Sequence, residues 1–141
     1  MVEDKASYTL KLTEDGNVEA AALPDVKGLH LTKSAVLLEV LAMIPSIGNG
    51  VFRLTDKDTE DYARLGNIGR IVGLGPNAFG ARSPINVERD SLVGKFVLFN
   101  SYTGYQVIYK GTRLNINDDF NVLAVLDDVN DLDREFILST F

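Results

Sequence analysis

The chain lacks cysteine and tryptophan and contains a single histidine, His30. Without thiols it cannot form disulfide bridges, thiolate zinc sites or cysteine nucleophiles. One histidine cannot build a multi-histidine metal site, and a Ser-His-Asp triad would depend on a residue in the least regular part of the chain. No G-x-S-x-G nucleophile motif is present. We therefore expect a surface histidine, no metal, no cofactor and no enzymatic activity.

Basic residues and long hydrophobic runs are also scarce. Fourteen Lys and Arg stand against 20 Asp and Glu, a net charge of −6, which argues against nucleic acid as the main partner because such binding neutralises phosphates. The longest apolar run, 35–45, is interrupted by Glu39 and is too short to span a bilayer. The N-terminus, 1–5, is polar and does not resemble a signal peptide. We expect a soluble, cytoplasmic protein with protein partners and no membrane partner.

The hydrophobic content and the spacing of the apolar segments predict a small all-β domain. The 141 residues are 45% hydrophobic, enough for one buried core. Short apolar segments separated by glycine turns are typical of a small barrel or sandwich. We expect strands at 8–12, 70–75, 95–99, 105–109, 114–116 and 120–126.

Other parts of the chain are less regular. Residues 1–33 form an N-terminal extension whose shape the pattern does not predict. The apolar run 35–44 fits either a helix or a strand, since periodicity alone does not separate the two. Residues 128–141 form a tail whose apolar side chains would suit a short docking helix or strand.

Three motifs invite a chemical interpretation and are better explained structurally. Gly73–Ala78 fits G-x-G-x-x-A, but Gly80 and Pro84 interrupt the helix that a dinucleotide site needs, so we predict a strand ending in a tight turn. The acidic segment 127–133 lacks the glycine and glutamate of a calcium loop. The aromatic residues at 96–109 lack a basic groove for single-stranded nucleic acid, so we expect core or cavity-lining roles.

The apolar cluster Val51–Leu54 lies within a long glycine-containing segment, 45–68. Long loops without structure of their own are usually functional or disordered. Such a cluster could dock into a partner's groove, or it could be another strand of the core; the pattern leaves both open.

The order of several segments resembles the GroES-like co-chaperonins (the chaperonin-10 family), in a form similar to phage-encoded relatives. Residues 36–41 resemble the first barrel strand, and 47–55 resemble the mobile loop, with glycines before a hydrophobic tripeptide. The segment 69–79 is similar to the strand after that loop, 93–99 to the next strand, and 119–126 to the closing strand. The resemblance covers about 34–127.

The chain also departs from the family pattern. Lys95 stands where an aspartate is usual, Arg53 replaces an aliphatic residue of the tripeptide, and one extra residue sits before Leu123. The N-terminal extension and the C-terminal tail are absent from the short bacterial form. These departures indicate a divergent phage protein.

The resemblance implies a GroES-like β-barrel whose seven copies form a ring that caps a GroEL-type chaperonin of the host or the phage and assists folding. A phage origin would imply a capsid protein as the client. Residues 76–92 would form the roof-side loop, and Tyr102 and Tyr105 would face the enclosed cavity. Val51, Phe52 and Leu54 would carry the docking, within a chaperonin-binding set that comprises Gly50, Val51, Phe52, Arg53 and Leu54.

Two other functions stay open. A virion structural or adaptor protein could reuse the same small barrel, because fold does not fix function. An oligonucleotide-binding barrel would show salt-dependent binding to single strands, although the acidity of the chain argues against it.

Overall fold

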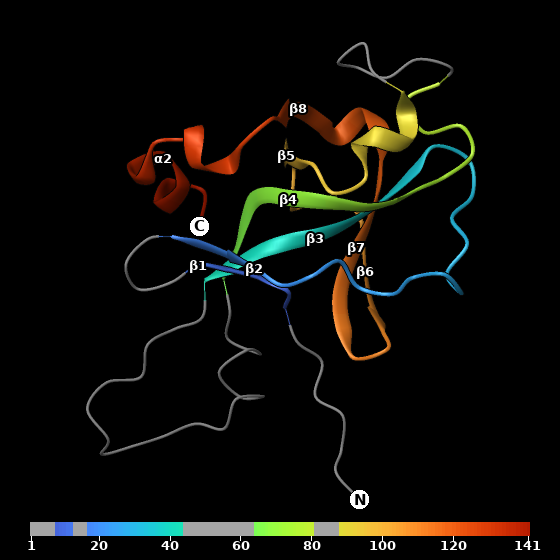
Figure 1. Cartoon of the computed structure of the whole chain (residues 1–141), viewed down its shortest axis with the longest axis horizontal. Helices are drawn as coiled ribbons and strands as arrows, with labels where there is room; N and C mark the ends of the chain where they lie inside the picture. The colour runs from blue at the N-terminus through green and yellow to red at the C-terminus, as the bar shows by residue number, and fades with distance from the viewer. Residues whose placement is uncertain (1–7, 13–16, 44–63, 81–87) are drawn as a thin grey trace, which may run out of the picture.

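The computed structural model describes residues 8–12, 17–43, 64–80 and 88–141, and in these ranges the chain is mostly strand, with a single short α-helix (Figure 1). The all-β prediction is therefore confirmed. The strands are β1 (Leu10–Leu12), β2 (Val18–Ala20), β3 (Ala35–Met43), β4 (Arg64–Leu74), β5 (Phe96–Phe99), β6 (Tyr105–Tyr109), β7 (Thr112–Asp118) and β8 (Val122–Leu126). The helical turns are η1 (Arg89–Leu92), η2 (Asp119–Asn121), η3 (Val129–Asp131) and the helix α2 (Arg134–Ser139).

The eight strands form one mixed sheet in the order β2-β1-β3-β4-β5-β8, and β7 joins β3 and carries β6. All pairings are antiparallel except β1 with β3. Among the described strands, β6 pairs only with β7 and β8 pairs only with β5. The sheet therefore has open edges in the described part of the chain, and the expected closure into a barrel is not seen there.

The ambiguous run 35–44 is the central strand β3. It pairs with β4 along one edge, and with β7 and then β1 along the other. Seven of its nine residues are buried. A strand that is covered on both faces has a continuous apolar sequence without alternation. Its sequence therefore looks the same as that of a buried helix, and the pattern could not distinguish the two.

Both terminal extensions contribute to the core. Leu10 and Leu12 of β1 pack with Leu41 and Ile68, and against the same cluster lie Val129 and Ile137 of the tail. A second cluster on β3, β4 and β7 is covered by residues of the connection from β2 to β3, namely Val26, Leu29 and Leu31. A third hydrophobic cluster includes Val36 and Phe99 and fills the space between β3, β4 and β5.

The glycine-rich motif 73–78 closes β4 as predicted. The strand ends at Leu74, and a turn follows at residues 76–80, with no helix opening there. A side chain at Gly75 would lie 2.6 Å from the Lys33 carbonyl oxygen, so this glycine is needed for a close approach of two backbones. At its other end β4 begins at Arg64, whereas the sequence predicted loop up to residue 68.

Candidate partner-binding site

The predicted docking residues Gly50–Leu54 lie outside the described residues, as does everything from 44 to 63. The structure does define where that segment begins and ends. Met43 of β3 and Arg64 of β4 are paired at the end of the antiparallel ladder, so residues 44–63 connect two adjacent strand ends. The two extensions meet at this place, which we call the loop base. β1 pairs with Ala42 and Met43, and the tail packs against β4 at Gly66 and Ile68.

Gly66 allows the tail to approach the loop base. A Cβ atom at this position would lie 2.7 Å from Oγ1 of Thr140 and 3.2 Å from the ring of Phe141. A side chain here would force Thr140 and Phe141 to shift, so glycine at this position lets the end of the chain lie directly against β4. The resemblance gave no role to the tail, and no sequence signal connected it with Gly66.

A buried ion pair joins β3 and β4 and ties the N-terminal extension to them. Glu39 and Arg70 are cross-strand neighbours, with 2.5 Å between Arg70 Nε and Glu39 Oε1 and 3.0 Å between Nη2 and Oε2. Arg70 also donates to the carbonyl of Ala21 at 2.8 Å, and the Thr9 hydroxyl donates to Glu39. The two ends of the extension's hairpin are thus held by one pair of charges.

The same pair shows the cost of burying charge. Burial raises the pKa of the Glu39 carboxyl above its ordinary value, and the hydrogen bonds and positive charge of Arg70 oppose that rise. The sequence does contain a sign of this ion pair, since Glu39 is the one charged residue in the apolar run 35–45 and a buried charge needs a partner. The sequence did not identify Arg70 as that partner.

A cluster of asparagines fixes the turn between β5 and β6. Asn117, buried on β7, donates to the carbonyl oxygens of Asn100 and Thr103 and to Oδ1 of Asn115, and accepts from Asn121 at 2.6 Å. Buried amides satisfied in this way rigidify their surroundings. The sequence analysis did not predict this role for the asparagines.

Gly104 completes the turn. It has φ +96°, and a Cβ there would lie 2.6 Å from Oδ1 of Asn115 and 2.7 Å from the carbonyl oxygen of Ile116. Both the left-handed backbone and the tight packing require glycine.

This rigid turn displays the two tyrosines that the resemblance placed toward a cavity. Tyr102 is 91% exposed and Tyr105 is 72% exposed, in contrast to Phe99, which is buried. Tyr105 and the exposed Phe120 line an open hollow of about 430 Å³ whose floor includes Asn117 and Gly104. Core packing is therefore the role of Phe99, as expected, while the tyrosines are available to a partner.

A second hollow lies at the open edge of the sheet. Leu98 pairs with Ala124 and Phe99 with Val122, so Leu123 has no partner on β5 and forms a β-bulge. Its side chain is 74% exposed and, with Phe136 of α2, lines a hollow of about 420 Å³. Bulges at sheet edges re-aim side chains in this way.

The other candidates from the sequence have structural roles. His30 is exposed, as predicted. Within 127–133, Asp128 accepts a hydrogen bond from the backbone of Asn130 and caps η3. In the described ranges no three His, Asp or Glu side chains gather in a way that could hold a metal ion.

No family model matches the sequence, and a search of the curated proteins finds no match. Among the residues that the structure describes, no helix is both long enough and apolar enough to cross a membrane.

Proposed function

We propose that the protein is a co-chaperonin, which caps a GroEL-type chaperonin through the apolar cluster Val51–Leu54 and so assists protein folding. The observation that carries the proposal is the loop base. Two paired strand ends, Met43 and Arg64, are joined by residues 44–63, whereas hairpin loops usually have two to five residues. A long connection that leaves and rejoins a rigid sheet suits a segment that docks into another protein.

The energetics of docking favour an assembly of several copies. Burying two or three apolar side chains contributes roughly 1.5–3 kcal/mol each, and ordering the backbone of the loop opposes this gain at roughly 1–2 kcal/mol per residue. One loop should therefore bind weakly. Several loops on one ring act at high effective concentration and bind firmly while each contact stays reversible. We propose a homo-oligomeric ring, heptameric by resemblance, with Tyr102 and Tyr105 facing the enclosed space.

The docking residues can be tested by substitution. Phe52→Asp should abolish binding to an immobilised tetradecameric chaperonin, because a charge would enter an apolar groove, and should leave the oligomeric state unchanged. Leu23→Asp is the matched control, since Leu23 is an exposed leucine elsewhere on the chain. Loss of the assembly in Phe52→Asp would instead identify Phe52 as a core residue and refute the proposed docking role.

A further inference from the structure

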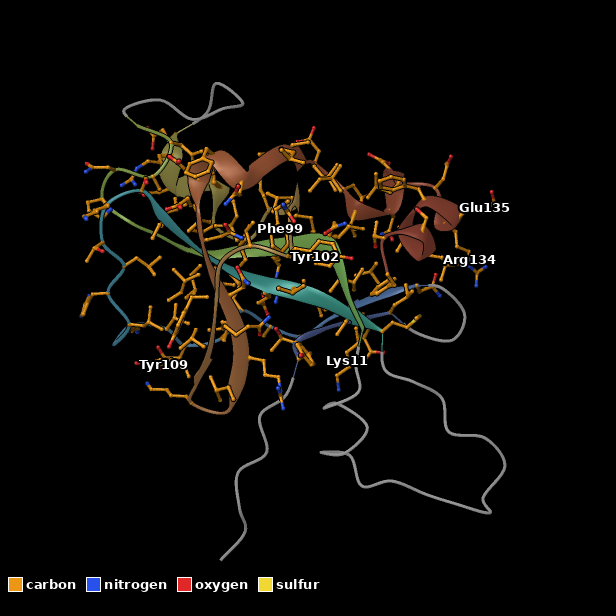
Figure 2. The ribbon with its side chains drawn as sticks, turned by 180° about the vertical axis from the view of Figure 1, so that it is seen from behind. Lys11, Phe99, Tyr102, Tyr109, Arg134 and Glu135 are labelled. Atoms are coloured by element: carbon orange, nitrogen blue, oxygen red, sulfur yellow. The ribbon has the colours of Figure 1, made fainter. Side chains whose placement is uncertain are left out.

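The hollow beside Tyr105 lies at the end of β6 that is far from the hairpin tip. Figure 2, the view from behind, shows Tyr109 near the tip, and Tyr102, in the turn that precedes β6, at the opposite end. Tyr105 pairs with Ile116, and because side chains alternate along β7, Asp118 points to the same face as Ile116. All three residues line the hollow of about 430 Å³, so the ring of Tyr105 and the carboxylate of Asp118 share one wall.

A second aromatic ring lines the same hollow. Phe120 follows Asp118 by two residues, in the turn η2, and its side chain is 73% exposed. The faces of aromatic rings carry partial negative charge and attract cations that stand within about 6 Å of the ring centre. Tyr105 and Phe120 therefore offer two such rings, on either side of Asp118 in the lining of one hollow.

Elsewhere the chain supplies its own cations to aromatic rings. Lys110 lies 5.5 Å from the centre of the Tyr109 ring. Arg113 lies 5.4 Å from the centre of the Tyr8 ring. In the part of the chain that the structure describes, no lysine or arginine stands over either aromatic ring of the hollow. A cation at these two rings has to come from another molecule.

The side-chain donors around the hollow are engaged, while acceptors are left over. The Thr103 hydroxyl donates to the carbonyl oxygen of Asn100 at 2.9 Å. The Asn121 amide donates to Oδ1 of Asn117 at 2.6 Å, and the Asn117 amide donates within the turn. The described residues provide no donor for Oδ1 of Asn121 or for the carboxylate of Asp118. A ligand that fits these groups must donate hydrogen bonds.

Asp118 has no structural task that would explain its position. It precedes η2 at the N-cap, but its side chain forms no capping hydrogen bond. The neighbouring Asp119 differs, since its carboxylate accepts the backbone N–H of Phe79 at 2.7 Å. The carboxylate of Asp118 is therefore free to pair with a cation in the hollow.

We propose that this hollow binds the guanidinium group of an arginine side chain presented by a partner polypeptide. A guanidinium stacks on aromatic faces and donates two parallel hydrogen bonds to a carboxylate, which matches the two rings and Asp118. Its remaining N–H groups can reach Oδ1 of Asn121. The net charge of −6 favours the approach of a basic partner. The site needs neither the ring nor the chaperonin of the proposed function.

A matched pair of peptides tests the ligand chemistry. The probes are acetyl-Gly-Arg-Gly-amide and the same peptide with citrulline, which has the shape of arginine without its charge. Saturation-transfer difference NMR of the full chain, titrated at constant ionic strength, detects weak binding at any oligomeric state. The arginine peptide should bind about fivefold or more tightly than the citrulline peptide. Equal binding of the two peptides, or no binding of either, would overturn the proposal.

Substitutions locate the site. Tyr105→Leu and Asp118→Asn should each weaken the arginine peptide about fivefold or more. Tyr102→Leu removes an exposed tyrosine that does not line the hollow, and Asp127→Asn removes the same charge from an exposed aspartate outside it; both controls should bind as the wild type does. Equal losses in Asp118→Asn and Asp127→Asn would show attraction by net charge alone and would overturn the site. Chaperonin binding through Val51–Leu54 is measured separately, so the two proposals can fail independently.

Discussion

At the residue scale, the ion pair of Glu39 and Arg70 links β3 with β4 and also holds the N-terminal extension. Their hydrogen bonds reach Thr9 and Ala21, so the position of the N-terminal hairpin depends on a charge pair inside the sheet. Burying such a pair can cost as much as the attraction returns, but leaving one partner alone is strongly unfavourable. The pair is therefore expected to fix the arrangement of the extension more than to raise the total stability.

Arg70→Met should lower the free energy of unfolding by about 3–5 kcal/mol at neutral pH, because Glu39 would remain buried without a partner. The double variant Glu39→Leu/Arg70→Met should recover most of this loss. Urea denaturation gives both values. Asp25→Asn, which breaks the exposed pair with Lys110, is the control and should leave the midpoint unchanged.

The loss in Arg70→Met should depend on pH. Arg70 holds down the pKa of Glu39, so its removal raises that pKa further above the ordinary glutamate value. A carboxyl whose pKa is higher in the folded state stabilises that state below its unfolded pKa, and this contribution is lost as pH rises through the folded pKa. Arg70→Met should therefore lose stability with rising pH more steeply than the wild type. Parallel profiles would show that Glu39 does not titrate as described.

Gly104 is a second residue with a measurable structural role. Gly104→Ala should destabilise the protein by about 1–3 kcal/mol or more, because it combines a left-handed backbone with contacts under 3 Å. Gly80→Ala is the matched control, since Gly80 has φ +63° but nothing within 4 Å of its missing Cβ, and should cost about 1–2 kcal/mol. Thermal unfolding measures both. Equal losses would mean that the packing around Asn115 and Ile116 is not tight.

At the element scale, most strands of the sheet follow from the sequence. The segments at 95–99, 105–109 and 120–126 alternate or end at glycine turns, and they are strands within a few residues of the prediction. The β6–β7 turn, Lys110-Gly111, has positive φ at both residues, which matches the twist of a hairpin. β2 was missed because three residues, 18–20, give no readable period, and only their pairing with β1 defines them as a strand.

The tail shows what sequence reasoning could foresee and what it could not. A short helix with apolar side chains was one of the two predicted forms, and α2 bears it out. The surface on which it docks was not predictable, because Leu10, Leu41 and Ile68 come from three distant segments. Nothing local in the sequence indicates that these segments meet the tail.

Substitution of neighbouring residues on α2 separates its two faces. Ile137→Ala should lower the free energy of unfolding by about 2–5 kcal/mol, because Ile137 is buried in the cluster with β1 and β4. Leu138→Ala should change it by less than about 0.5 kcal/mol, since Leu138 is exposed. Chemical denaturation of dilute protein distinguishes them. Equal effects would indicate that the tail does not pack as described.

At the scale of the whole molecule, the extensions are part of the sheet and its core. β1 and the tail meet at the loop base, where Met43 and Arg64 pair on either side of residues 44–63. The sequence predicted an all-β domain, which follows from local pattern, whereas for the cluster Val51–Leu54 the pattern left a docking loop and a further core strand both open. It did not predict the open edges, because strand pairing at a distance leaves little local trace.

The central claim is that the protein binds a chaperonin ring, and co-sedimentation of the purified wild-type chain with a tetradecameric bacterial chaperonin tests it most directly. The assay should be run with ATP, with ADP and without nucleotide, and repeated with the Phe52→Asp variant. The account predicts binding that requires nucleotide and disappears in the variant. Absence of binding under every nucleotide condition would contradict it.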